Sequence, residues 1–356
     1  MDIRNNALRG IAILGIMLHN YCHLLGFAVK ENEYTFTVGK ALQFWDKLTL
    51  PDHDILIHIL SFFGHYGVPV FLFVSGYGLV KKYEKGSIKD GNGNDAQFSM
   101  PAPLPFMRYH FLKLFRLMII GYVVFVAVYF LRNNDGAVVY SFDRILAQLG
   151  MVINFVFKYP DKVIKPGPYW YFGLMLQLYA LYVLVFNRWR GWKILVVFVV
   201  LCWVVQLLAN ALGENVLNHV RYNFFGAVLP FAMGIAYARW GRELPRAGYL
   251  ALTLLSFVVV LFGSFRFGWW LWTPAFVVIG AVSTVRLLPP FLLNPFSWTG
   301  TLSAAIFVMH PLAREIIIGH YRRSDIYTGI FIYVFTAFAM SMLLQYILKY
   351  IPKPKI

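Results

Sequence analysis

The chain contains little charge for its length, and little of that charge is negative. Only 13% of its 356 residues are charged, whereas 59% are hydrophobic. A soluble globule of this size could not hide so much apolar surface from water, so the composition excludes a soluble protein and predicts a polytopic membrane protein. The 16 acidic residues are outnumbered by 32 basic ones, which gives a net charge of +16.

Cysteine is also scarce, with Cys22 and Cys202 each inside an apolar run. Two isolated cysteines cannot build a disulfide framework or a cysteine-rich metal centre, so we interpret both as packing residues. The hydrophilic segment 81–110 lacks the glycine spacing of a phosphate-binding or dinucleotide-binding loop, and the chain shows no internal repeat.

Long apolar runs are abundant, and each has close to the roughly 20 residues that a membrane-spanning helix needs. A weaker run at 142–157 contains polar residues, so it predicts an interfacial or re-entrant helix. The predicted fold class is therefore all-α, a helical bundle of about ten transmembrane helices. The ten runs lie at 8–29, 55–80, 112–131, 168–187, 194–212, 222–239, 248–265, 269–286, 298–318 and 327–349.

The basic residues alternate between loops in a way that predicts the orientation. If the N-terminus is cytoplasmic, the same side receives the basic residues of 81–110, 188–193, 239–246 and 349–355, as expected for cytoplasmic loops. Arg322 and Arg323 are exceptions on the outer side. We therefore expect both termini to be cytoplasmic in a multi-pass protein of the inner membrane, surrounded by lipid. Nucleic acid is not an expected partner, because the basic residues are spread over short loops.

The chain reads as a single membrane domain over residues 1–356, with no appended soluble domain. Residues 81–110 pass from a basic run through glycine and asparagine to a proline-rich stretch, which predicts a flexible cytoplasmic loop. Residues 132–167 form an outer loop that includes the predicted interfacial helix.

The first apolar run contains Arg9, His19, Asn20 and His23, and such polar groups are costly in lipid. On a helix, Arg9 and His19 lie roughly 15 Å apart along the axis, which places Arg9 near the cytoplasmic face and His19 near mid-membrane. His19 and His23 share a face, but no cysteine or glutamate at ligand spacing completes a zinc site, so we expect no metal. The alternatives for His19 are a hydrogen-bonded core residue and a catalyst.

The second apolar run adds Asp54, His58 and His65 close to one stripe of a helix. One interpretation is a face that packs against other helices through small and polar residues. The other is a cavity that reaches from the outer surface toward mid-membrane.

Several short motifs in a fixed order resemble the acyltransferase-3 family of integral membrane acyltransferases. The resemblance covers nearly the whole chain. The motifs that carry it are Arg9 with His19, the run from Gly67-Val68 to Ser75-Gly76-Tyr77, Lys113-Leu114-Phe115-Arg116, Trp170-Tyr171, and Ser303 followed by His310-Pro311.

This resemblance implies transfer of an acyl group, usually acetyl, from cytoplasmic acyl-CoA to a hydroxyl or amine of a surface glycan or lipid-linked sugar. The family histidine corresponds to His19 and the family arginine to Arg9. The family places one more residue between the two, so Asn20 holds the position that aligns with Arg9. Either His19 acts from a rotated face, through a local π-bulge, or another histidine has taken its role.

The predicted roles follow from side-chain chemistry. An imidazole is a suitable base for an acceptor hydroxyl, which makes His19 the candidate base. Arginine and lysine side chains suit the phosphates of CoA. For Lys113 and Arg116, anchoring of the span at the cytoplasmic face is the alternative. The donor-binding candidates are Arg9, Lys113 and Arg116.

The other candidates are less specific. Ser75 either donates a hydrogen bond to the thioester oxygen or is a small residue at a helix crossing. His310 and Arg314 either orient the acceptor, or Arg314 pairs with Glu315. The residues assigned to substrate binding are His23, His58, His65, Asp54 and Trp170.

A transporter or flippase for a lipid or sugar is the alternative function. Proton-coupled carriers usually bury acidic residues as relays, whereas here Glu315 is the only carboxylate expected in a span. The two halves also lack paired broken helices or an evident repeat. The acyltransferase is therefore the favoured hypothesis.

Overall fold

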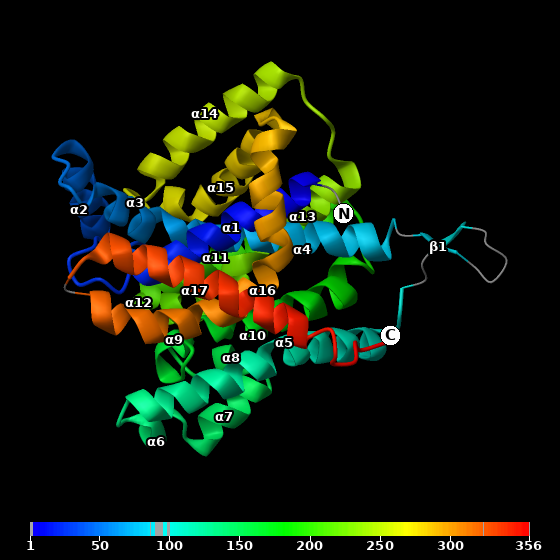
Figure 1. Ribbon diagram of the computed structural model, residues 1–356. Coiled ribbons are helices and arrows are strands. Elements are labelled where there is room, and N and C mark those ends of the chain that lie inside the picture. The colour runs from blue at the N-terminus through cyan, green and yellow to red at the C-terminus, as the bar shows by residue number, and fades with distance from the viewer. Residues whose placement is uncertain (1–2, 86, 90–94, 98–99, 323, 356) are drawn as a thin grey trace.

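The computed structural model describes residues 3–85, 87–89, 95–97, 100–322 and 324–355 (Figure 1). The described part of the chain is almost entirely helical, which confirms the predicted all-α class. Its only strands are β1 (Ser87–Lys89) and β2 (Asp95–Gln97), which pair antiparallel as a small hairpin.

All ten apolar runs form helices. Eight helical segments of the described residues are long and apolar enough to cross a membrane. The other two are α1, which carries more polar residues, and α13, which has 17 residues. The bounds are α1 (Ile3–Cys22), α3 to α4 (Ile55–Tyr83), α5 (Pro103–Arg132), η2 to η3 (Gly167–Phe186, containing α10, Trp170–Leu181), α11 (Trp192–Leu212), α13 (Phe224–Trp240), α14 (Arg246–Gly263), α15 (Phe267–Leu287), α16 (Pro290–Tyr321) and α17 (Ile326–Ile347).

The second span is interrupted, which the sequence did not predict. It consists of α3 (Ile55–Phe63), the short 3-10 turn η1 (Gly64–Tyr66) and α4 (Gly67–Tyr83). The backbone of α1 packs directly against this interruption. A Cβ on Gly64 would lie 2.6 Å from the Gly15 carbonyl oxygen, and one on Gly67 would lie 2.2 Å from that of Ala12. The predicted stripe from Asp54 to His65 is therefore not one continuous helix face.

Helix α1 lies inside the bundle, packed against α16 and α4 (Figure 1). Small residues permit the close approach, since a Cβ on Gly10 or on Gly300 would lie only 1.9 Å from a backbone oxygen of the facing helix. Ile13 and Met17 are fully buried. Because neighbouring helices surround α1, its polar residues face protein rather than lipid.

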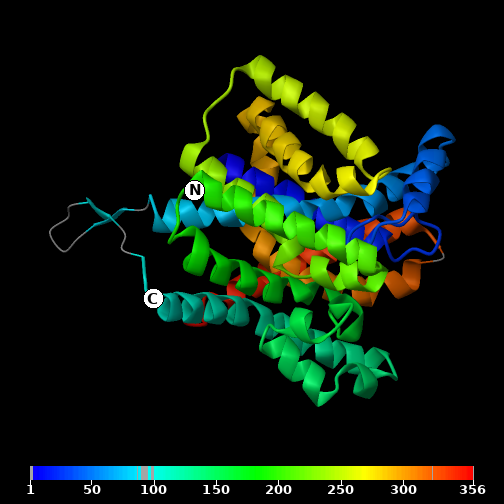
Figure 2. The ribbon, with the colours of Figure 1, turned by 180° about the vertical axis from the view of Figure 1, so that it is seen from behind.

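Both termini lie at the same end of the bundle as the β hairpin, and α2 (Val38–Thr49) lies at the opposite end (Figures 1 and 2). We call these the termini end and the α2 end. The exceptional Arg322 lies at the α2 end, where it donates a hydrogen bond to the Leu24 carbonyl (2.7 Å). Arg323 lies outside the described residues.

Two predicted loop segments differ from the structure. Helix α5 begins at Pro103, so the predicted flexible loop 81–110 is shorter, and its residues 86, 90–94 and 98–99 lie outside the described part of the chain. The predicted helix 142–157 is two helices, α7 (Phe142–Leu149) and α8 (Ile153–Val156), because Met151 between them has a positive φ of 56°. The remaining short helices are α6 (Gly136–Val139), α9 (Pro160–Val163) and α12 (Glu214–Arg221).

Candidate active site

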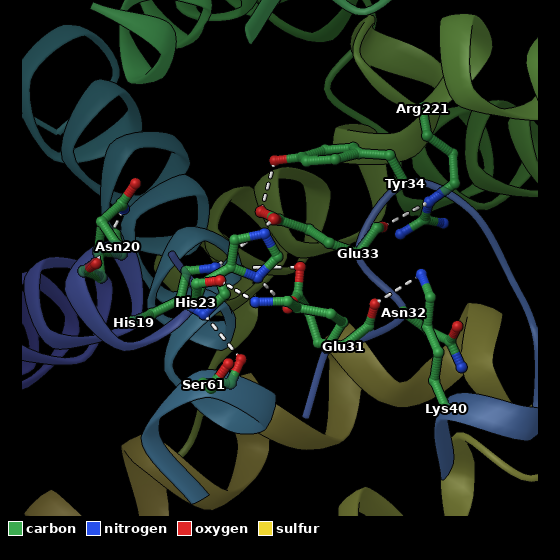
Figure 3. Close-up of polar contacts among 12 residues, drawn as sticks. His19, Asn20, His23, Glu31, Asn32, Glu33, Tyr34, Lys40, Ser61 and Arg221 are labelled. Carbon is green, nitrogen blue, oxygen red and sulfur yellow. Dashed lines mark hydrogen bonds and ion pairs between the residues drawn. The ribbon is translucent and has the colours of Figure 1, made fainter. Parts of the chain in front are cut away.

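His19 is buried near the α2 end of α1, with a hydrogen bond that determines its tautomer. Its Nδ1 lies 2.9 Å from the Ser61 carbonyl oxygen (Figure 3). A carbonyl can only accept a hydrogen bond, so Nδ1 carries the proton and Nε2 is left as an acceptor. The Ser61 hydroxyl donates in turn to the Val29 carbonyl (2.7 Å). The Ser61 carbonyl of α3 thus fixes the ring, and Ser61 itself is tied to Val29 in the segment that follows α1.

The 23–37 loop, between α1 and α2, brings two carboxyl groups back to this histidine. Glu31 Oε1 lies 4.0 Å and Glu33 Oε2 lies 3.9 Å from His19 Nε2. His23 Nδ1 is 2.8 Å from the other oxygen of Glu31. Figure 3 shows both glutamates approaching the histidines from this loop. Neither glutamate was among the candidate residues predicted from the sequence.

Hydrogen bonds to the loop backbone hold these carboxyl groups in place. Lys40 donates to the Glu31 carbonyl (3.0 Å), and Arg221 on α12 donates to the Glu33 carbonyl (3.1 Å) (Figure 3). The Tyr34 hydroxyl donates to the Glu33 side chain (2.6 Å). The position of the acidic pair therefore depends on helices distant in sequence.

The two loop glutamates have pKa values shifted in opposite directions. Burial opposes ionisation of Glu31, but attraction to His19 and the hydrogen bond with His23 outweigh it, so its pKa is lowered. Burial, followed by repulsion from Glu31, raises the pKa of Glu33 well above its ordinary value. One carboxyl is thus a stable anion beside the histidine, and the other favours its protonated form.

His19, His23 and Glu33, but not Glu31, line a cavity of about 250 Å³ between α1, the 23–37 loop and α10. Its walls are partly aromatic, since Tyr34 stacks on Tyr222 at 3.8 Å and meets Trp170 edge-on at 5.4 Å between ring centroids. Flat aromatic faces beside hydrogen-bonding groups suit a sugar ring. The polar and aromatic lining residues are His19, Asn20, His23, Glu33, Tyr34, His65, Asp161, Lys162, Lys165, Trp170, Tyr171, Tyr222, Phe307 and Arg314.

Three of the predicted substrate-binding residues, His23, His65 and Trp170, line this cavity with His19. His58 and Asp54 do not. His58 accepts a hydrogen bond from the Val29 amide (3.3 Å), and Asp54 pairs with His53 (3.1 Å). The predicted stripe is thus divided, because η1 turns His65 toward α1.

The remaining candidates lie elsewhere. His310 is fully buried, and its Nδ1 donates to the Ile306 carbonyl (3.0 Å). The Ser75 hydroxyl donates to the Phe71 carbonyl one turn back (2.8 Å). Neither belongs to the lining of the His19 cavity.

Two predicted details of the helices are corrected. Helix α1 is an uninterrupted α-helix, so no π-bulge rotates His19, and His19 and Asn20 both line the cavity. Arg314 donates to the backbone and side-chain oxygens of Asn20 (3.1 and 3.0 Å), while Glu315 accepts from Asn133 (3.1 Å). The hydrogen bonds of Arg314 therefore go to α1 rather than to Glu315.

The basic residues predicted to bind the donor separate into two groups. Arg116 donates to the Leu348 and Ile351 carbonyls, where it caps the end of α17. Lys113 lies close enough to Lys82 and to Arg9 for their like charges to repel. Arg9 also interacts with Tyr171, which lines the His19 cavity. Arg9 and Lys113 thus form a cationic group connected to the cavity through Tyr171.

In the structure, Glu31 joins the histidine pair of α1 as a third potential metal ligand, which the sequence spacing did not indicate. Donor atoms of His19, His23 and Glu31 all lie within 4.8 Å of one another. Two histidines and a carboxylate form a set that zinc accepts. The His23–Glu31 hydrogen bond also satisfies these groups on its own, and the absence of a metal stays a prediction.

The fold defines a polytopic helical membrane protein in which His19 and Glu33 line a cavity and the Glu31 carboxyl group lies beside His19. Residues 4–350 match a family model described as the acyltransferase domain of the acyltransferase-3 family. The chain therefore belongs to this family, which confirms the resemblance found in the sequence, and the protein is a membrane acyltransferase. No curated protein and no solved structure matches the chain.

Proposed function

We propose that this protein is an O-acyltransferase that moves an acetyl group from cytoplasmic acyl-CoA to a sugar of a cell-surface glycan or lipid-linked precursor, with His19 as general base. The observation that carries the proposal is the hydrogen bond from Nδ1 to the Ser61 carbonyl. This bond leaves the lone pair of Nε2 available in a cavity that has room for a sugar group.

The reaction uses this nitrogen twice. As the acceptor hydroxyl oxygen attacks the thioester carbonyl carbon, Nε2 removes the hydroxyl proton, and a tetrahedral intermediate forms. Its collapse breaks the carbon–sulfur bond, and the departing thiolate takes the proton from the imidazolium. The products are an ester and free CoA, and His19 returns to its starting state.

Glu31 supports this cycle through electrostatics. Its anionic carboxylate lies 4.0 Å from Nε2, close enough to stabilise the positive charge that the imidazole gains. The hydrogen bond from His23 holds the carboxylate in this position. Glu31 and His23 are therefore positioning residues, and His19 is the group that contacts the acceptor.

Arg9 and Lys113 are the donor-binding residues in this proposal. Both are at or near the termini end, and Arg9 lies roughly 15 Å along α1 from His19. The pantetheine arm of CoA is long enough to reach from phosphates bound there to the His19 cavity. Tyr171, which interacts with Arg9 and lines the cavity, lies on that route.

The test follows radiolabel from acetyl-CoA supplied to inside-out vesicles that contain wild type or His19→Ala. We expect wild type alone to transfer label to the glycan or lipid fraction. His53→Ala is the matched control, because His53 is exposed at the α2 end, and it should retain full transfer. His19→Gln serves as a second variant if His19→Ala reduces expression.

Full transfer by a stably inserted His19→Ala would overturn the assignment of the base. No label with wild type, together with sugar flux across the same vesicles, would favour the transporter.

A further inference from the structure

The cavity that contains His19 has more positive than negative charge. Lys162, Lys165 and Arg314 line it, against the carboxyl groups of Asp161 and Glu33. The raised pKa of Glu33 favours its neutral form, which leaves Asp161 as the single anion among the lining residues, against three cations. The anionic Glu31 does not line the cavity and is hydrogen-bonded to His23. A neutral sugar alone does not require this arrangement.

Two of these cations have no acidic partner within ion-pairing distance in the described part of the chain. Lys165 makes neither a hydrogen bond nor an ion pair there, and Arg314 donates only to the neutral Asn20. Lys162 differs, because it is exposed and lies over the Tyr159 ring, 4.9 Å from its centroid. Lys165 and Arg314 are therefore the two lining cations whose charge no carboxylate of the described chain neutralises by an ion pair.

The pair is held together at an energetic cost. Burial and the positive charge of Arg314 lower the pKa of Lys165, whereas attraction to Asp161 and Glu315 offsets only part of that effect. Like charges in a partly buried site are unfavourable unless an anion joins them. A bound carboxylate would supply that anion.

The position of the pair connects it to the reacting centre. Arg314 is hydrogen-bonded to Asn20, the residue next to His19. Lys165 lies shortly before α10, whose Trp170 and Tyr171 line the same cavity. A ligand held by both cations would lie in the cavity that Nε2 of His19 faces.

We propose that Lys165 and Arg314 form an anion-binding subsite that holds a carboxylate group of a substrate. Arginine presents a planar fork of donors that matches a carboxylate, and lysine adds a mobile point charge. The assignment of this site to a substrate rests on the proposed acyl transfer. The anion belongs either to an acidic sugar acceptor or to an acyl group with a terminal carboxylate.

The experiment measures binding to the purified full-length protein by titration calorimetry. The acceptor arm compares methyl glucuronide with methyl glucoside, and the donor arm compares succinyl-CoA with acetyl-CoA. In one arm, we expect wild type to bind the anionic member at least about tenfold more tightly, as charge-assisted hydrogen bonds predict. The arm that shows the preference identifies the source of the anion.

Lys165→Gln and Arg314→Gln should each remove this preference and leave binding of the neutral member unchanged. Lys162→Gln is the matched control, because it removes a cation from the same lining without touching the pair. Arg314→Lys should restore part of the preference if Arg314→Gln fails to fold. A wild type without preference in either arm, or a preference that survives both substitutions, would overturn the subsite.

The calorimetric result is independent of the transfer assay. Loss of transfer in His19→Ala with no anion preference would reject the subsite and leave the acyltransferase proposal standing. Full transfer in His19→Ala with an anion preference that depends on Lys165 would support the subsite and reject His19 as the base.

Discussion

Within the 23–37 loop, two glutamates separated by one residue acquire different electrostatic properties. Glu31 is hydrogen-bonded to His23, and its pKa is lowered, whereas Glu33 is buried beside that anion, and its pKa is raised. The difference is set by neighbours rather than by residue type. It assigns Glu31 to charge stabilisation and makes Glu33 a group whose ionisation opposes folding.

Glu33 therefore predicts how stability changes with pH. A carboxyl group whose pKa is raised in the folded state contributes stability below its unfolded pKa, and that contribution is lost as the pH rises through its folded pKa. Glu33→Gln mimics the protonated form and keeps an oxygen that accepts from Tyr34. We expect similar melting temperatures for wild type and Glu33→Gln at pH 4.5, and a progressively more stable variant as the pH rises to 9.

Thermal unfolding in detergent across this pH range provides the measurement. Glu214→Gln is the control, because Glu214 is exposed on α12 at the same end, and its difference from wild type should not change with pH. A constant difference between Glu33→Gln and wild type would show that Glu33 is ionised throughout.

Among the helices, α5 presents two basic residues to different partners. Lys113 and Arg116 lie less than one turn apart, yet Arg116 caps α17 through the Leu348 and Ile351 carbonyls. Lys113 instead lies near Arg9 on α1, close enough for their like charges to repel. The packing of α17 against the bundle thus gives Arg116 a structural contact that Lys113 lacks, and only Lys113 stays in the proposed donor site.

The two single variants should behave differently. Lys113→Ala is expected to raise KM for acetyl-CoA roughly tenfold, since one charged hydrogen bond to a phosphate is lost. Its melting temperature should stay close to that of wild type. Arg116→Ala should leave the donor KM nearly unchanged and destabilise the fold by about 1.5–3 kcal/mol, because two carbonyl groups lose a charged donor.

Initial rates against donor concentration, combined with thermal unfolding, separate these outcomes. Lys349→Ala, an exposed substitution near the same end, controls for a general loss of positive charge. An Arg116→Ala variant with a raised KM and unchanged stability would return Arg116 to the donor site.

Across the whole molecule, the termini and the β hairpin lie at one end (Figure 2). The His19 cavity, which residues of the 23–37 loop line, lies toward the other end. The basic loops at the termini end predict that this end faces the cytoplasm. An acyl group delivered from cytoplasmic CoA would then be used in a cavity near the outer face. The orientation of the bundle therefore decides whether acyl transfer is coupled to crossing of the membrane.

Cysteine labelling tests this orientation. The native Cys22 and Cys202 are buried, so new cysteines at exposed positions provide the signal. We expect a membrane-impermeant maleimide added to intact cells to label Thr49→Cys at the α2 end and not Arg242→Cys at the termini end. Labelling of Arg242→Cys alone would reverse the orientation, and permeabilised cells provide the control for reactivity.

The helical class, the positions of all ten helices and the family were predictable from the sequence. The helices depend on local information, because runs of about 20 apolar residues satisfy their own backbone hydrogen bonds and face lipid wherever they lie in the chain. The family follows from the order of several short motifs along the chain. His19 was also predictable as a candidate, since a histidine in such a run is conspicuous. Its acidic neighbours Glu31 and Glu33 carried only a weak signal, a pair of carboxyl groups soon after that run.

The tertiary structure alone decided what surrounds His19. The interruption at η1, the return of the 23–37 loop and the pairing of Arg314 with Asn20 all depend on contacts between segments distant in sequence. Hydropathy assigns a loop to the aqueous side and contains no information about whether it folds back into the bundle. Hydrogen bonds from Lys40 and Arg221 hold the 23–37 loop against the bundle, because only the packed helices place those donors beside its backbone.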